Sequence, residues 1–356
     1  MAFKSLVKTR ALKGGADCPQ AAADGSVVRQ PLEDNRLHPY RIVSAQRSRL
    51  PLAFAAGLLA AGLSFSACGA DAPEPAASAD SSRVRRDLAY GPHPERNVLD
   101  LYLPEKTMPG PWPVVVWIHS GGWYTGGKGG GGAARALVAR GYAVAAINYR
   151  FSQDAIFPAQ IEDCQRAIRW LRAHAGEYGL DPTRFGAWGG SAGGHLAALL
   201  GTAPEAFPAP AEDPHRHLSA HVSAVCAHNP PTNLARWDAQ ALPNATVVAN
   251  QPDSMVARLL DGTPEREPGR ARHASPLTYV SARAAPFFLV HGDRDRAVPP
   301  QQSISLHEAL RAAGVESTLH LIPGADHANA AFAQGVPHAA IAAFFDRHLR
   351  PTAASR

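Results

Sequence analysis

The sequence predicts an α/β protein with a mostly parallel sheet that is covered by helices on both faces. Short apolar runs alternate along the chain with helix-sized amphipathic stretches, which is the pattern of strand–helix–strand crossovers. Several runs, such as 112–119, are apolar at nearly every position, as strands covered on both faces must be. One run, 185–188, leads to a serine between glycines and then continues as a helix.

The individual elements follow from this alternation. The first two strands are expected at 87–91 and 97–104, around a proline-containing turn. Further buried strands are expected at 112–119, 142–149, 185–188, 222–228, 286–291 and 317–322. Helices are expected at 133–140, 158–175, 192–200, 302–313 and 338–348. The helix at 158–175 has one apolar stripe, an acidic first turn and a basic last turn, as helix periodicity and the helix dipole favour.

The chain before the first strand differs from a folded domain. Residues 1–49 are polar and arginine-rich, and we expect a disordered or non-native extension. The uncharged run 50–68 follows two arginines and ends in small residues, which is typical of a signal peptide; a membrane anchor is the alternative. Residues 69–85 are expected to be a flexible tether, and 86–350 the folded catalytic domain.

The end of the uncharged run, Ser66-Ala67-Cys68, resembles a bacterial lipoprotein signal. That resemblance implies lipidation at Cys68. The sequence thus predicts an exported protein, periplasmic or at the cell surface, with membrane attachment through a lipidated Cys68 or through the segment 50–67. The oligomeric state is not predicted.

Composition excludes other kinds of partner. The net charge is +5, but the arginines are scattered and form no basic stripe with interleaved aromatics, so no nucleic-acid binding is predicted. The four cysteines have no C-x-x-C spacing, so no metal site is predicted, and the chemistry below needs no cofactor. Cys164 falls on the apolar face of a helix and Cys226 in a strand, which favours buried thiols over a disulfide.

The serine between glycines is Ser191, in the pattern G-x-S-x-G from Gly189 to Gly193. A serine at the apex of a strand-to-helix turn needs a strained backbone, and only glycines fit beside it. In this nucleophile elbow the N–H groups of the following helix, which begins at Ala192, face the position where negative charge develops in acyl transfer. Ser191 is therefore the candidate nucleophile.

A nucleophilic serine needs a base, and the base needs a carboxylate that orients it. Loops after later parallel strands open into the same crevice as the elbow. Asp293 and Asp295 follow the strand at 286–291, and His327 follows the strand at 317–322. The chain order serine, aspartate, histidine is the order expected of a hydrolase with this elbow.

From about residue 86 to residue 349 the sequence resembles the α/β-hydrolase esterases, in particular bacterial carboxylesterases that include feruloyl and acetyl esterases. The resemblance implies an α/β-hydrolase fold, with an eight-stranded, mostly parallel sheet and a small cap insertion. The family's acid ends an H-G-x-x-D motif, which falls on Asp295 in preference to Asp293. Its histidine follows a G-x-x-H turn, which falls on His327.

The stretch 119–123, His-Ser-Gly-Gly-Trp, resembles the H-G-G-x-W-type oxyanion loop of these esterases. The resemblance implies an oxyanion hole made of the backbone N–H groups of Gly121, Gly122 and Ala192. Ser120 stands where the pattern has a glycine, at a position that is not an expected donor.

Trp123 and Tyr124 are candidates for a substrate-pocket wall, and ordinary packing under the loop is the alternative for Trp123. The same stretch contains G-x-x-x-x-G-K from Gly122 to Lys128. Gly129 replaces the hydroxyl residue of a phosphate-binding loop, so phosphate binding is not predicted.

The sequence therefore predicts an exported serine carboxylesterase that cleaves a small-molecule or polysaccharide-linked ester through an acyl-enzyme on Ser191. Substrate choice is assigned to a cap-like insertion at 229–286. An amidase, such as an arylformamidase, and a catalytically inert, surface-tethered binding protein are the alternatives. Activity is expected to fall as pH drops through about 6 to 7, where an unperturbed imidazole protonates.

Overall fold

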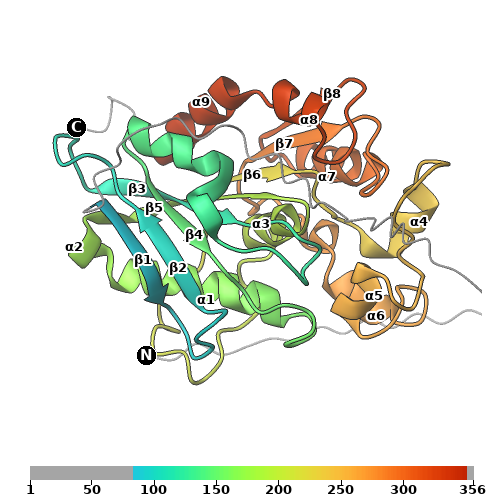
Figure 1. The fold of residues 1–356 in the computed structure, drawn as a ribbon, viewed down its shortest axis with the longest axis horizontal. Helices are drawn as coiled ribbons and strands as arrows, with labels where there is room; N and C mark the ends of the chain where they lie inside the picture. Colours follow the sequence, from blue (N-terminus) through green and yellow to red (C-terminus); the bar gives the residue numbers. More distant parts are fainter. Residues whose placement is uncertain (1–82, 351–356) are drawn as a thin grey trace, which may run out of the picture. The chain divides into compact units, whose positions relative to one another are not determined.

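A computed structural model describes residues 83–350. These residues form an eight-stranded sheet in the order β1-β2-β4-β3-β5-β6-β7-β8 (Figure 1). The strands are β1 (Val84–Ala89), β2 (Val98–Tyr102), β3 (Trp112–Ile118), β4 (Ala143–Ile147), β5 (Leu180–Gly190), β6 (Ala224–His228), β7 (Phe287–Gly292) and β8 (Ser317–Ile322). Within this sheet β2 pairs antiparallel with both neighbours, and the remaining pairs are parallel. The predicted mostly parallel eight-stranded sheet is confirmed.

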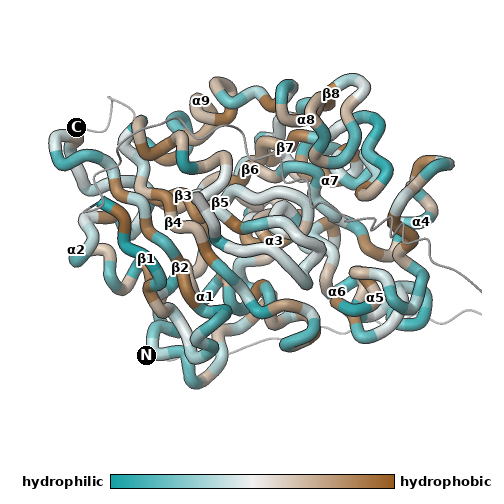
Figure 2. Tube along the Cα trace, in the orientation of Figure 1, coloured by the Kyte–Doolittle hydropathy of each residue, from teal (hydrophilic) through white to brown (hydrophobic). Residues whose placement is uncertain are grey.

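Helices cover both faces of the sheet. They are η2 (Gly129–Arg140), α1 (Ala159–Ala173), α2 (Ala175–Tyr178), α3 (Ala192–Thr202), η3 (Leu234–Arg236), α4 (Trp237–Gln240), α5 (Met255–Leu260), α6 (Pro268–His273), η4 (Pro276–Tyr279), α7 (Gln301–Ala312), α8 (Ala330–Gly335) and α9 (His338–Leu349). Successive side chains of a strand point to opposite faces of the sheet. Val114 and Val116 therefore belong to the hydrophobic core formed with α1 and α3, and Val115 belongs to the core formed with η2 and α9. Hydrophobic residues are concentrated along β2, β3 and β4 (Figure 2).

The helix expected at 133–140 is a 3-10 helix that begins earlier, at Gly129. Gly131, Ala134 and Leu137 are buried, and their spacing of three matches the three residues per turn of a 3-10 helix. Gly131 and Gly132 have positive φ values of 72° and 51°, a backbone conformation that favours glycine.

The functional edge of the sheet is the carboxyl end of β3 and β5 to β8, where the loops that carry the predicted site residues emerge. Helices α4, α5 and α6 belong to the 229–286 insertion and lie together on the side of the sheet away from β1 and β2 (Figure 1). The sheet thus brings five loops to one region, and the 229–286 insertion is the loop that follows β6.

The predictions for 1–49, 50–68 and Cys68 lie outside the described residues. Strand β1 begins at Val84, two residues inside the stretch 69–85 that was predicted to be a tether. Between residues 83 and 350, no helix has the length and apolar character needed to cross a membrane. Cys164 and Cys226 are buried free thiols, as predicted.

Candidate active site

The turn between β5 and α3 holds Ser191 at φ 52° and ψ −119°, where a non-glycine residue is strained. Its backbone N–H donates to the carbonyl oxygen of His228 at 2.8 Å, which fixes the turn to the neighbouring strand. A Cβ at Gly189 would lie within 3.0 Å of the backbone of Gly193, and a Cβ at Gly193 within 3.0 Å of the carbonyl oxygen of Ile118. The strained serine and its two glycines match the turn that the sequence predicts.

Three side chains from separate loops meet at this edge of the sheet. The Nε2 atom of His327 lies 3.1 Å from Ser191 Oγ, and its Nδ1 atom lies 2.7 Å from Asp295 Oδ2. A carboxylate only accepts, so Nδ1 carries the proton and the Nε2 lone pair faces the serine hydroxyl. Asp293 accepts instead from the backbone N–H of Gly324 at 2.7 Å. The geometry therefore brings together the residues that the sequence singled out, with Asp295 rather than Asp293 on the histidine.

Asp295 is fully buried, and donors surround its carboxylate. The backbone N–H groups of Ala297 and Val298 donate to Oδ1 at 2.9 Å and 2.8 Å, and His291 Nε2 lies 3.3 Å from Oδ2. Burial alone would raise the pKa of Asp295, but the hydrogen bonds from His291 and His327 outweigh burial and hold this pKa well below its usual range. Asp295 is therefore ionised and can stabilise a positive charge on His327.

The loop after β3 lies beside the elbow. Ser120 Oγ donates to the carbonyl oxygen of Gly190 at 2.8 Å, which ties this loop to the residue before the serine. Gly121 and Gly122 have φ values of 116° and 58°, in the region that favours glycine. Within the described part of the chain, the backbone N–H groups of Gly121, Gly122 and Ala192 donate to no other residue. These three groups are thus free to bind a ligand oxygen.

The side chains of Trp123 and Tyr124 have different surroundings. Trp123 is 1% exposed, and its indole Nε1 donates to His195 Nδ1 at 3.1 Å. The indole therefore packs beneath the loop, the alternative that the sequence left open, instead of forming a pocket wall. Tyr124 is 38% exposed, and the Arg258 guanidinium of α5 lies 5.7 Å from its ring centroid. Of the two residues, only Tyr124 remains a candidate for the pocket wall.

His195 connects the oxyanion loop, the helix after the elbow and the insertion. An indole N–H only donates, so His195 Nδ1 accepts from Trp123 and the proton sits on Nε2, which donates to the carbonyl oxygen of Ala274 at 2.6 Å. Burial lowers the pKa of His195 to about 4, and the bond to Ala274 opposes that shift in part. A neutral, fully buried imidazole thus holds the three segments together.

Buried histidines make the stability of the fold dependent on pH. Burial lowers the pKa of His119 and His195 to about 4 and that of His228 to about 3. In the unfolded chain these groups titrate near 6.5, so below that pH the unfolded state binds more protons and the fold loses stability. We expect the free energy of unfolding to fall between about pH 6 and pH 4 by about 1.4 kcal/mol per pH unit for each histidine. Urea unfolding at about pH 7 and pH 5 measures this; equal free energies would contradict it.

The 229–286 insertion is closed at its base. The backbone N–H of Leu277 donates to the carbonyl oxygen of Thr232 at 3.0 Å. The backbone N–H of Leu234 donates to Ser275 Oγ at 2.9 Å. The beginning and end of the insertion are therefore bonded to each other, while its middle, through α5, borders the loop that contains Tyr124.

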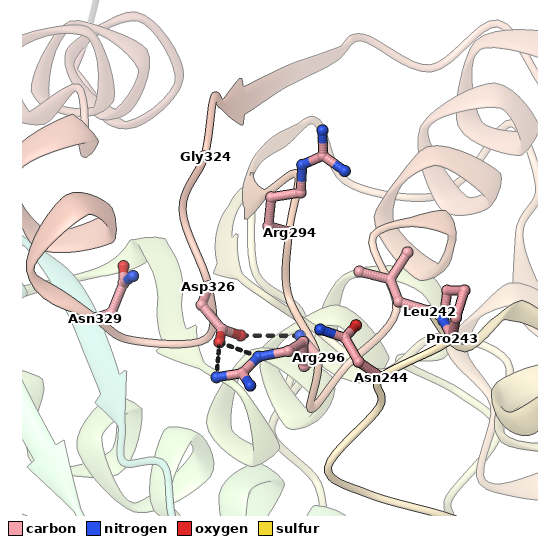
Figure 3. A pocket seen from close by; sticks show the side chains of 8 residues that line it. All are labelled: Leu242, Pro243, Asn244, Arg294, Arg296, Gly324, Asp326 and Asn329. Atoms are coloured by element: carbon pink, nitrogen blue, oxygen red, sulfur yellow. Dashed lines mark hydrogen bonds and ion pairs between the residues drawn. The ribbon is translucent and has the colours of Figure 1, made fainter.

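A cavity of about 470 Å³ lies beside the loops that carry Asp295 and His327 (Figure 3). Its lining residues come from these two loops and from the insertion: Arg294, Arg296, Gly324, Asp326, Asn329, Leu242, Pro243 and Asn244. Asp326 accepts from the backbone N–H of Arg296 at 2.9 Å and from its Nε at 2.5 Å. This pair joins the two loops beside the contact between Asp295 and His327, because Arg296 follows Asp295 and Asp326 precedes His327.

Lys128, in the stretch that resembles a phosphate loop, pairs with Asp100 at 2.6 Å and with Asp87 at 2.8 Å. Two carboxylates thus engage its ammonium group. In the part of the chain that the structure describes, no group of three or more His, Cys, Asp or Glu side chains is arranged to hold a metal ion.

The model of the BD-FAE family matches residues 99–310, which is more than half of the chain. The chain belongs to the BD-FAE family. This is an α/β-hydrolase carboxylesterase family, so the resemblance seen in the sequence is confirmed. The BD-FAE chain also has the sheet and helices of the α/β-hydrolase fold.

Among curated proteins, the BD-FAE chain is 32% identical over 255 residues to a probable carboxylic ester hydrolase, LipM, of Mycobacterium tuberculosis, covering 68% of this chain and 55% of the relative. It is 33% identical over 249 residues to esterase LipQ of the same organism, covering 68% and 56%. The chain therefore spans just over half the length of these relatives.

Among solved structures, the BD-FAE chain resembles a truncated carbohydrate esterase from gut microbiota, with a TM-score of 0.65 and 26% identity over 75% of this chain and 96% of the other. It also resembles a thermophilic esterase of Thermogutta terrifontis, with a TM-score of 0.59 and 27% identity over 77% of this chain and 96% of the other.

Sequence reasoning missed three features of the site: His291, His195 and the pair of Arg296 with Asp326. His291 is the first residue of the H-G-x-x-D motif, and His195 follows the elbow glycines, so both stand in motifs that were used for other residues. A polar residue that is expected to be buried needs a hydrogen-bond partner. This requirement could have indicated structural roles for His291 and His195. The partners themselves come from distant parts of the chain and carry no local signal.

Proposed function

We propose that this protein is a serine hydrolase that cleaves carboxylic esters through an acyl-enzyme on Ser191. The observation that carries the proposal is the 3.1 Å contact between His327 Nε2 and Ser191 Oγ, with Asp295 on the other ring nitrogen. The names of the relatives, a probable carboxylic ester hydrolase and esterases, support an ester as the substrate.

The geometry supports the following steps. Ser191 Oγ attacks the ester carbonyl while His327 Nε2 removes its proton, and the buried carboxylate of Asp295 stabilises the imidazolium. The free N–H groups of Gly121, Gly122 and Ala192 bind the oxyanion. The imidazolium then gives its proton to the leaving alcohol, and the same ring activates the water that hydrolyses the acyl-enzyme.

The proposal includes export, with the catalytic domain in the periplasm or at the cell surface. Its support is the run 50–68 with Cys68 at its end, which has the composition of a signal with a lipid attachment site. Fractionation of cells with an antibody to the catalytic domain tests this part: recovery in the soluble cytoplasmic fraction alone would exclude it.

The enzymatic part is tested with 4-nitrophenyl acetate and a phosphonate that labels active-site serines. We expect turnover and one adduct on Ser191, both lost in Ser191→Ala. Ser120 offers a matched control, because it follows the neighbouring strand and its hydroxyl bonds Gly190 instead of His327. Ser120→Ala should keep the adduct; a folded protein with neither turnover nor adduct would exclude the serine mechanism. Preference for N-formylkynurenine over the ester would instead favour the amidase.

A further inference from the structure

The proposed mechanism determines where the alcohol half of the ester must lie. His327 Nε2 returns its proton to the leaving oxygen, so that oxygen lies at the ring and the alcohol half begins beside the loop that carries His327. The 470 Å³ cavity is bounded by this loop through Asp326 and Asn329. Asp326 directly precedes His327 and Asn329 follows it by two residues, so the cavity adjoins the loop beside which the alcohol half begins.

Among the side chains that line the cavity, Asp326 has no free acceptor capacity, whereas Asn329 offers a free donor. Asp326 Oδ1 accepts from the backbone N–H groups of Arg296 and His327, and its Oδ2 accepts from two nitrogens of the Arg296 guanidinium. Four bonds fill the capacity of a carboxylate. Asn329 Oδ1 accepts from the backbone N–H of Phe332 at 2.9 Å, which leaves its amide NH₂ as a donor. Acceptor oxygens on a ligand would match the free amide NH₂ of Asn329.

The cavity also contains one loosely held cation. Arg296 is neutralised by Asp326, whereas the side chain of Arg294 is 76% exposed and extends away from that pair (Figure 3). The contact of Arg294 with Asp293 is long, at 4.0 Å, and the same Asp293 oxygen already accepts from Gly324 at 2.7 Å. The Arg294 guanidinium is a planar fork that suits a carboxylate.

We propose that this cavity binds the alcohol half of the ester and selects alcohols that carry a carboxylate among their hydroxyl groups, as a hexuronic acid does. The carboxylate pairs with Arg294, the hydroxyl oxygens accept from Asn329, and Leu242 and Pro243 form the apolar wall. This inference rests on the proposed ester hydrolysis, because it takes the direction of the leaving group from that mechanism.

Product inhibition tests the inference in the full-chain protein. Methyl β-glucuronoside carries a carboxylate where methyl β-glucoside carries a CH₂OH group. Each glycoside is tested as an inhibitor of the hydrolysis of 4-nitrophenyl acetate. We expect the inhibition constant of the glucuronoside to be about tenfold lower at low salt, and this advantage to disappear in Arg294→Gln. Arg283→Gln removes another exposed arginine, far from the cavity residues in sequence and paired with Glu205, and should keep the advantage.

Equal inhibition by both glycosides, or an advantage that survives in Arg294→Gln, would overturn the inference. Loss of the advantage in Arg283→Gln as well would also overturn it, because the effect would then come from net charge. Failure of the proposed function has a different signature: the wild-type protein would not hydrolyse 4-nitrophenyl acetate at all.

Discussion

Replacement of Asp295 by asparagine is expected to lower kcat for 4-nitrophenyl acetate by about 10³- to 10⁴-fold, with KM little changed. An amide can donate to the Nδ1 atom of His327, which favours the tautomer whose proton sits on Nε2. That tautomer cannot accept the proton of Ser191, whose Oγ lies 3.1 Å from Nε2. The neutral side chain also removes the charge that stabilises the imidazolium. Steady-state kinetics of the purified variant measure both effects.

Asp293→Asn is the matched control, because it makes the same chemical change two residues earlier. The carboxylate of Asp293 accepts from Gly324 and does not contact His327. Its variant should stay within a few-fold of wild type on 4-nitrophenyl acetate. Comparable losses in the two variants, or an Asp295→Asn enzyme with more than about a tenth of wild-type kcat, would remove Asp295 from the mechanism.

Gly193→Ala is expected to lower the free energy of unfolding by about 3 kcal/mol and kcat by about 10²-fold or more. A Cβ at this position would lie within 3.0 Å of the carbonyl oxygens of Ile118 and His119, which are backbone atoms that cannot rotate away. Helix α3 and the end of β3 must then separate, which moves the N–H of Ala192 away from that of Gly122. Urea unfolding and steady-state kinetics measure the two losses.

Gly176→Ala, in the short helix α2, provides the comparison. A Cβ there would meet no atom within 4 Å, and its φ is not in the left-handed region. Alanine is the better helix former by up to about 1 kcal/mol, so this variant should equal or exceed wild type in stability. If Gly193→Ala behaved in the same way, the close contact between α3 and β3 would be wrong.

The central strands β3, β4, β6 and β7 could be predicted because each is nearly continuous in apolar residues, and burial on both faces leaves that pattern in the sequence. The positions of Ser191, Asp295 and His327 could be predicted because parallel strands end at one edge, and the loops after β5, β7 and β8 must meet there. Their catalytic roles remain predictions, as do the signal peptide and the lipidation of Cys68.

Other features depend on contacts that leave no local pattern. Trp123 has a φ of 64°, and this backbone conformation accompanies an indole buried against His195 instead of one that faces a pocket. Local residue types carry no information about that conformation. The bond from His195 to Ala274 joins residues 79 positions apart, and only the folded insertion brings them together. The helix at Gly129 buries every third residue from Gly131 to Leu137, a spacing that matches a 3-10 helix.

The closed base of the insertion has a consequence for how enzymes of this design diversify. Thr232 is hydrogen-bonded to Leu277, and Leu234 to Ser275. The two ends of the insertion are therefore joined where the chain leaves the sheet and returns to it. The entropy of closing a loop between joined ends grows only slowly with its length. The residues between these two hydrogen bonds can therefore be lengthened, shortened or exchanged as a unit, while the strands whose loops carry Ser191, Asp295 and His327 stay unchanged.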